Sequence, residues 1–135
     1  MPIELEIVSP EKLLLSKPVD MVVIPAAEGE MGVLVNHAPM IVLLRGGTIR
    51  LYQGTAVTEQ FYVDGGFAEV TPSRVTVLAN EATPLAELSR AEGQARLAAA
   101  EATYAGIDKL DVEALDVAMD RIQAARAMVD VAPAL

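Results

Sequence analysis

The sequence of 135 residues contains no cysteine, no tryptophan and one histidine. Without thiols the chain can form neither disulfides nor thiolate metal sites, and a single imidazole cannot build a multi-histidine metal site. Only 4% of the residues are aromatic although 53% are hydrophobic, so the core must be built from Val, Leu, Ile, Met and Ala. A chain this apolar is expected to fold rather than to be disordered.

Basic residues are also scarce. Lys and Arg number 10 against 19 Asp and Glu, which gives a net charge of −9. This charge argues against nucleic acid or an anionic membrane surface as a partner, because both require a basic face. No segment approaches the roughly 18 consecutive apolar residues of a membrane span, and the N-terminal residues do not resemble a signal peptide. We expect an intracellular, soluble protein with no direct membrane insertion.

The composition changes near residue 81. Residues 1–80 hold 12 of the 16 Val, 7 of the 9 Gly and 6 of the 8 Pro, whereas residues 81–135 hold 16 of the 22 Ala. Val with Gly and Pro is typical of strands and turns, and dense Ala is typical of helices. We therefore predict a β domain over residues 1–82, followed by an α-helical hairpin over residues 83–135.

The β half predicts short strands that are separated by turn residues about every 8–12 positions, which is the pattern of a β-sandwich or barrel. Ile3, Leu5 and Ile7 alternate with acidic residues, as in a half-buried strand. Gly46-Gly47 and Gly65-Gly66 lie at expected turns. The expected strands are 3–7, 12–16, 19–24, 31–35, 40–44, 48–52, 56–63, 67–71 and 75–79.

The helical half predicts two helices. We expect the first over residues 84–105, with Thr83 as its N-cap and Gly106 as its C-cap, and Asp108 or Asp111 as the N-cap of the second. Each helix has a stripe at heptad spacing: Ala91, Ala95, Ala98, Ala102 and Ala105 in the first, and Leu115, Ala118, Ile122, Ala125 and Val129 in the second. These stripes predict an antiparallel hairpin. Small side chains bury little apolar area, so we expect the hairpin to be held weakly and to be able to move. The alternative is that it is a static appendage.

Few residues offer chemistry. His37 lies in a predicted loop without a nucleophile motif around it, so a loop or interface role fits it best. Glu28 and Glu30 flank Gly29 in a tight turn, where acid–base work or cation binding is less expected than solvation or contact with a partner. The helix arginines are expected to pair with neighbouring acids, the alternative being a phosphate site. They are Arg90, Arg96, Arg121 and Arg126.

Residues 28–39, Glu-Gly-Glu-Met-Gly-Val-Leu-Val-Asn-His-Ala-Pro, resemble the E-G-x-x-G-x-L/Y-x-x-H-A-P stretch of the epsilon subunit of F-type ATP synthases, the equivalent of the mitochondrial delta subunit. Residues 5–11, 46–51 and 63–70 fit the beginning and the later hairpins of the same family. The resemblance covers the whole chain. It implies a β-sandwich of about ten strands, followed by a C-terminal antiparallel two-helix hairpin.

This resemblance implies a non-catalytic subunit of the central rotor stalk. Its sandwich would bind the gamma subunit and sit on the c-ring, and would thereby help to couple proton flow to rotation and ATP synthesis. The residues implied to face the ring are Glu28, Gly29, Glu30 and His37. The implied location is peripheral, on the cytoplasmic side of the bacterial plasma (inner) membrane.

The resemblance also implies a regulatory hairpin, which extends along gamma and blocks ATP hydrolysis by the alpha/beta catalytic head. No cofactor is implied, but some relatives bind ATP as a regulatory ligand through an I/L-D-x-x-R-A motif and arginines of the second helix. The positions that align with this pattern are Glu87, Arg90, Ala91, Arg121 and Arg126, of which Arg90 and Ala91 fit the motif. Ala86 and Glu87 depart from the motif, and residues 111–130 carry five acids against two arginines, where the inhibitory helix is usually basic.

Two other classes remain open. A stand-alone sandwich enzyme or ligand-binding domain would need a concave pocket with convergent polar groups. An oligomerisation adaptor would need a hairpin that is a fixed coiled coil, with uniformly slow hydrogen exchange over residues 84–129.

Overall fold

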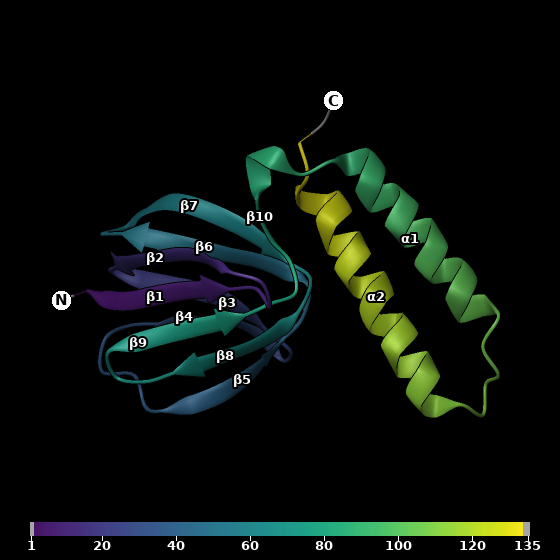
Figure 1. Ribbon diagram of the computed structural model, residues 1–135, viewed down its shortest axis with the longest axis horizontal. Helices are drawn as coiled ribbons and strands as arrows, with labels where there is room; N and C mark the ends of the chain where they lie inside the picture. Colours follow the sequence, from purple (N-terminus) through teal and green to yellow (C-terminus); the bar gives the residue numbers. More distant parts are fainter. Residues whose placement is uncertain (1, 134–135) are drawn as a thin grey trace.

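The structure, a computed structural model, describes residues 2–133 as a β-sandwich with a helical hairpin beside one end of it (Figure 1). The strands are β1 (Ile3–Val8), β2 (Leu13–Val19), β3 (Met21–Ala26), β4 (Gly29–Val33), β5 (Met40–Leu44), β6 (Gly47–Gln53), β7 (Ala56–Val63), β8 (Gly66–Val70), β9 (Arg74–Leu78) and β10 (Ala82–Pro84). A 3-10 turn, η1 (Leu85–Glu87), leads to helices α1 (Arg90–Ala105) and α2 (Val112–Val131). The predicted fold class is confirmed.

The strands form one ten-stranded sheet that curls so that its inner face encloses the core. Its order is β10-β7-β6-β3-β5-β8-β9-β1-β2, and β4 pairs with β3. The pairing of β1 with β9 is parallel, and the other pairings are antiparallel. Strands β3 and β5 share a single residue pair, Ala26 with Leu44, so the two halves of the sheet are joined there by very few hydrogen bonds.

The core is aliphatic, as the shortage of aromatic residues predicted. Ile3, Leu5 and Ile7 of β1 are fully buried, and the acidic residues between them face outward. Burying each side chain of this size contributes roughly 1.5–3 kcal/mol. Inward-facing residues from β1 to β9 complete the cluster, which includes Val22, Ile24, Val33, Ile49, Leu51, Val63, Val75 and Val77.

The junction between the two halves differs from the prediction. Residues 82–84 form strand β10, in which Ala82 pairs with Val63, so Thr83 is a strand residue and not an N-cap. Helix α1 begins at Arg90, and the Ser89 hydroxyl caps it. A Thr-Pro pair is a good local signal for a helix start, but pairing with β7 provides backbone partners that local sequence does not reveal. The division into domains at residues 82 and 83 stays a prediction.

The other helix ends agree with the prediction. Asp111 is the N-cap of α2, and its carboxylate accepts a hydrogen bond from the Ala114 amide at 3.1 Å. Gly106 is the C-cap of α1 with a φ of −88°, so the left-handed conformation that favours glycine at this position is not used.

Helix α2 lies between the sandwich and α1 (Figure 1). The stripe predicted for α2 is confirmed as a packed side of the helix. Ala118 and Ala125 are buried, and Leu115, Ile122 and Val129 are half-buried. The predicted stripe of α1 is wrong, because its five alanines are all exposed. Gly93 and Ala100 are buried instead, and a Cβ on Gly93 would lie 3.1 Å from the Val129 Cγ2 atom. In so alanine-rich a helix, hydrophobic spacing cannot identify the packed face.

We expect Gly66→Ala to lower the free energy of unfolding by at least about 2 kcal/mol. Gly66 has a φ of +119°, and a Cβ there would lie 2.0 Å from the Leu78 carbonyl oxygen. Urea denaturation measures the loss. Gly54→Ala is the matched control, because its φ is +61° but no atom lies within 4 Å of the added Cβ. It should cost only about 1–2 kcal/mol, and equal losses in both variants would show that the contact with Leu78 is unimportant.

Candidate functional site

The acidic turn lies between β3 and β4. Glu28 is exposed, and Gly29 adopts a φ of +139° that favours glycine. Glu30 is also exposed, and it accepts a hydrogen bond from the Arg50 guanidinium at 2.7 Å. This bond holds the pKa of the Glu30 carboxyl below its ordinary value. The turn therefore presents two exposed acidic side chains, one of which is held in place by Arg50 of β6.

His37 lies at the other end of β4, in the loop that leads to β5. The preceding Asn36 has a φ of +67°, and its amide donates to the Pro72 carbonyl at 2.6 Å. The His37 ring nitrogen Nδ1 lies 2.9 Å from the Ala38 carbonyl oxygen. The structure does not bring His37 and the acidic turn together, because the whole of β4 separates them. The strand expected at residues 31–35 already implied this separation.

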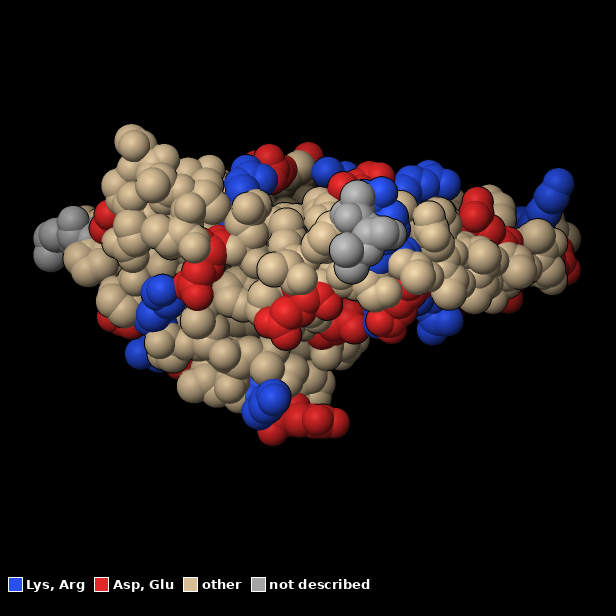
Figure 2. Space-filling model, turned by 90° about the horizontal axis from the view of Figure 1, so that it is seen from above, with Lys and Arg blue, Asp and Glu red and all other residues tan. Residues whose placement is uncertain are grey.

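No metal centre is assembled in the part of the chain that the structure describes, residues 2–133, where no group of three or more His, Asp or Glu residues is placed to hold an ion. Figure 2 shows acidic side chains gathered over the region between the sandwich and the hairpin. Within the same range, no helix has the length and apolar character needed to cross a membrane.

A small set of contacts holds the hairpin against the sandwich. We call Gly46, Tyr62, Gln123 and Ala124 the docking contact. The side-chain amide of Gln123 makes two hydrogen bonds to the backbone of Gly46. Its Nε2 atom donates to the Gly46 carbonyl at 2.6 Å, and its Oε1 atom accepts from the Gly46 backbone amide at 2.9 Å. The Tyr62 hydroxyl donates to the Ala124 carbonyl at 2.6 Å. Burial raises the pKa of Tyr62, so its hydroxyl keeps the proton that it donates.

Gly46 is required for this close approach. A Cβ at this position would lie 2.4 Å from the Ala124 Cα and 2.7 Å from its Cβ, which no side chain could occupy without moving α2. Beside this point, a second apolar cluster joins Tyr62 to Leu88, Met128 and Ala132. The approach of the two backbones therefore depends on a glycine facing an alanine.

An ion-pair network connects α1 to the linker before β10. Arg96 binds both carboxylate oxygens of Glu81, at 2.8 and 2.9 Å, and also the Glu92 carboxylate at 2.8 Å. The bonds to Glu81 raise the pKa of Arg96 above its ordinary value. The Glu81 amide in turn donates to the Asp64 carboxylate at 3.2 Å, and burial raises the pKa of Asp64. Residues from β7–β8, the linker and α1 thus share one network.

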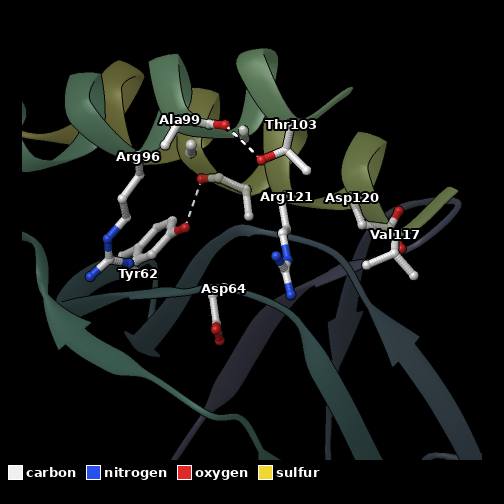
Figure 3. A pocket seen from close by; sticks show the side chains of 11 residues that line it. Tyr62, Asp64, Arg96, Ala99, Thr103, Val117, Asp120 and Arg121 are labelled. Carbon is white, nitrogen blue, oxygen red and sulfur yellow. Dashed lines mark hydrogen bonds between the residues drawn. The ribbon is translucent and has the colours of Figure 1, made fainter. Parts of the chain in front are cut away.

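A cavity of about 430 Å³ lies between these elements (Figure 3). Most of its polar groups are already bonded: Arg96 to two carboxylates, the Tyr62 hydroxyl to a helix carbonyl, and the Thr103 hydroxyl to the Ala99 carbonyl. Figure 3 shows Arg121 pointing from α2 toward the strands, on the same side as Asp64. No nucleophile and base meet among the residues that line it.

The structure does not bring together the residues matched to the ATP-binding pattern. Glu87 and Ala91 are exposed near the start of α1, while Arg90 donates to the Ala132 carbonyl at 3.1 Å at the end of α2. Arg121 lines the cavity, and Arg126 is exposed. Five residues apart on a helix, these two arginines point about 140° away from each other. A joint ATP site stays a prediction, and this arrangement offers no common phosphate cradle.

An exposed apolar row lies on the outer face of the sheet and was not predicted from the sequence. We call these residues the apolar row: Leu43 (β5), Phe67 (β8), Leu78 (β9), Val8 (β1) and Leu13 (the first residue of β2). They are direct cross-strand neighbours in that order. The exposed fractions of Leu43, Phe67 and Leu78 are 60%, 54% and 45%. The run Met-Ile-Val-Leu-Leu in β5 is apolar on both faces of the strand. This run was the signal in the sequence that could have revealed the row.

A sandwich of this kind with a docked two-helix hairpin is the fold of ATP synthase delta and epsilon chains. The family described as "ATP synthase, Delta/Epsilon chain, beta-sandwich domain" matches residues 2–85. The ATP synthase epsilon chain of Granulibacter bethesdensis is 70% identical over 128 residues, which cover 95% of each chain. The Gluconacetobacter diazotrophicus epsilon chain is 51% identical over 98% of this chain and 94% of that one. The chain belongs to the delta/epsilon chain family of ATP synthases.

Solved structures agree with this assignment. A chain in the structure of the Euglena gracilis mitochondrial ATP synthase, described as OSCP/F1/c-ring, has a TM-score of 0.75 and 25% identity, and covers 94% of this chain and 79% of its own length. A chain of the Tetrahymena thermophila mitochondrial ATP synthase, described as central stalk/c-ring, has a TM-score of 0.64 over 98% of both chains. At 14% identity the second shows likeness of fold alone.

We expect Gly46→Ala to detach the hairpin while the sandwich stays folded, because the added Cβ would overlap Ala124 and break the docking contact. Hydrogen exchange measures the result: amides of α1 and α2 should exchange at least about tenfold faster, and those of β1 and β9 at the native rate. Gly32→Ala is the control, since its Cβ would meet only the Met21 sulfur at 3.6 Å. Unchanged exchange in α2 of the Gly46 variant would contradict the prediction.

Proposed function

We propose that the chain is a non-catalytic subunit of the rotor stalk of an ATP synthase, which binds the gamma subunit and the c-ring and helps to couple ring rotation to the catalytic head. The observation that carries this proposal is the exposed apolar face of the sandwich. Ile41 is 75% exposed beside the apolar row, although such side chains are usually covered. A partner that covers this face explains why it is apolar.

Family membership supports gamma as that partner. Five neighbouring strands contribute to the apolar row, so a partner lying across them would meet a surface wide enough for a stable complex. The similar Euglena chain belongs to a structure described as OSCP/F1/c-ring. Membership in such a complex also supports a peripheral location, on the cytoplasmic side of the bacterial membrane.

We assign the c-ring contact to strand β4. Among residues 2–133, which the structure describes, β4 pairs only with β3, so its other edge is open there. The acidic turn with Glu28, Gly29 and Glu30 lies at one end of β4, and His37 lies beyond the other. A ring surface that meets all four residues must therefore run along β4 rather than touch one end of the sandwich. The two acidic side chains of the turn suit a polar or basic surface on the ring.

The direct test is retention of the chain by a catalytic complex of alpha, beta and gamma subunits that was prepared without it. We expect the chain to co-purify with that complex, and not with the same alpha and beta subunits when gamma is left out. Adding the c-ring should produce a ternary assembly whose yield falls in the double variant Glu28→Lys, Glu30→Lys. Failure to bind the gamma-containing complex would refute the stalk assignment.

A second role, regulation of ATP hydrolysis by the hairpin, is favoured by the small size of the docking contact. Few hydrogen bonds and the pair Arg96–Glu81 hold the hairpin in addition to the apolar cluster around Tyr62, so a modest change in free energy would release it. A released hairpin would extend toward the catalytic head. The acidic surplus of residues 111–130 disfavours an acidic docking surface there, so we expect weak inhibition.

Truncation after Leu85 tests this role, because it removes both helices but keeps β10 paired with β7. We expect the assembled enzyme to hydrolyse ATP faster by less than about threefold, as weak inhibition is lost. Steady-state hydrolysis assays measure the change, with the full chain as reference. Unchanged hydrolysis would exclude the regulatory role and leave the stalk assignment intact.

A further inference from the structure

The pairing of strand β10 with β7 stops at Pro84, which lies opposite Phe61. Beyond this pair β7 continues, and its other side is paired with β6. Within residues 2–133, no strand pairs with the β10 side of β7 over residues 57–60. A hollow of about 350 Å³ lies beside these residues, where it is lined by β7, Pro84, Leu85 and Ala86. The sheet therefore has an open edge directly beyond the end of β10.

The segment after β10 would continue this pairing if it stayed extended. In the register of β10, the next partners are Leu85 with Gln60 and Ala86 with Glu59. Glu59 forms an ion pair with Lys17 at 2.6 Å, and the small side chain of Ala86 leaves room for that pair. Register and side-chain size thus both permit a longer β10.

The docked hairpin prevents this continuation. The 3-10 turn η1 bends the chain out of the strand conformation, and the Leu88 amide donates to the Leu85 carbonyl at 3.2 Å. The bend places Leu88 in the apolar cluster with Tyr62 and Met128, where it is buried. Met128 belongs to α2, so a released hairpin removes the apolar contact that the turn provides for. The linker then has no packing reason to stay bent.

Pro84 determines which amides a longer strand would offer to β7. It has no N–H, so it fits a paired strand only where its nitrogen points away from the partner. Backbone groups alternate along an antiparallel strand, so the amides of Leu85 and Glu87 would point toward β7 and that of Ala86 away from it. Leu85 would then exchange two hydrogen bonds with Gln60.

We propose that release of the hairpin turns η1 into strand, and that residues 85–87 add to the open edge of β7 as a continuation of β10. The inference rests on the hairpin release proposed above as the basis of regulation, and it gives the released state a structure of its own. The new pairs replace part of what the lost docking contact provided, so the linker is an element with two alternative conformations. A bulge in β7, where its register with β6 shifts between Glu59 and Val57, sets the limit of the extension.

The extension fixes where a released hairpin leaves the sandwich. Because β10 runs antiparallel to β7, three more residues carry the chain roughly 10 Å along β7 toward the turn between β6 and β7. The docking contact lies at the opposite end of β7, where Gly47 pairs with Val63. A hairpin held in this way cannot dock again until the added pairs break.

Amide exchange of the full-length Gly46→Ala variant tests the inference, because that variant is expected to release the hairpin. The amides of Leu85 and Gln60 should exchange at least about tenfold more slowly than in the unaltered chain, since both become hydrogen-bonded. The amide of Ala86 is an internal control that should not slow, because it points away from β7. Gly32→Ala is the matched control variant and should leave all three rates unchanged.

Ala86→Pro tests the same conversion from the side of the linker. Proline disfavours the helical conformation of the residue before it, here Leu85, whereas its missing amide costs no hydrogen bond in the extended strand. In this variant the amides of α2 should exchange at least about threefold faster, and the Gln60 amide at least about threefold more slowly.

The outcomes separate the inference from the proposals on which it rests. If α2 exchanges faster in either variant but the amides of Leu85 and Gln60 do not slow, the strand extension is wrong and release of the hairpin stands. If α2 exchange is unchanged in both variants, the hairpin is not released, and the inference falls together with the regulatory role. Neither result bears on the stalk assignment, which depends on binding to the complex that contains gamma.

Discussion

The placement of the hairpin depends on the contact between Gly46 and Ala124. Two backbones approach there within a distance that only the smallest residues allow, and the other bonds to α2 follow from that approach. The Gln123 amide reaches the Gly46 peptide, and the Tyr62 hydroxyl reaches a helix carbonyl, because the helix lies so close. The cavity beside Tyr62 is a further result of the same packing.

The two faces of the sheet perform different tasks with similar residues. Inside, Val, Ile and Leu fill the core without large aromatic side chains, which suits a strongly curled sheet. Outside, the cross-strand register brings Leu43, Phe67 and Leu78 into one line, although each comes from a different strand. The acidic side chains beside this line of apolar residues restrict which partner can cover it. A surplus of charge thereby becomes a specificity determinant.

Sequence alone predicted most of the fold, because alternation and turn residues are local signals. Nine strands, an N-cap of α2 at Asp108 or Asp111 and the packed side of α2 were predicted from such signals, and the structure selects Asp111 as the cap. Strand β10 was not, since its pairing with Val63 is a tertiary contact that overrides a good helix-start signal at Thr83. Nor could the candidate site be predicted in full, because the contact of Gly46 with Ala124 joins residues far apart in sequence.

The side chain of Gln123 meets Gly46 as a neighbouring strand would, with one donor and one acceptor. No neighbouring position on that side of α2 could replace it. The residues one turn away are Met119, Asp120, Arg126 and Ala127, and none of them has a side-chain amide. The helix therefore cannot shift along its axis to a second position with the same two hydrogen bonds to Gly46. Docking through this contact therefore has a single register along α2.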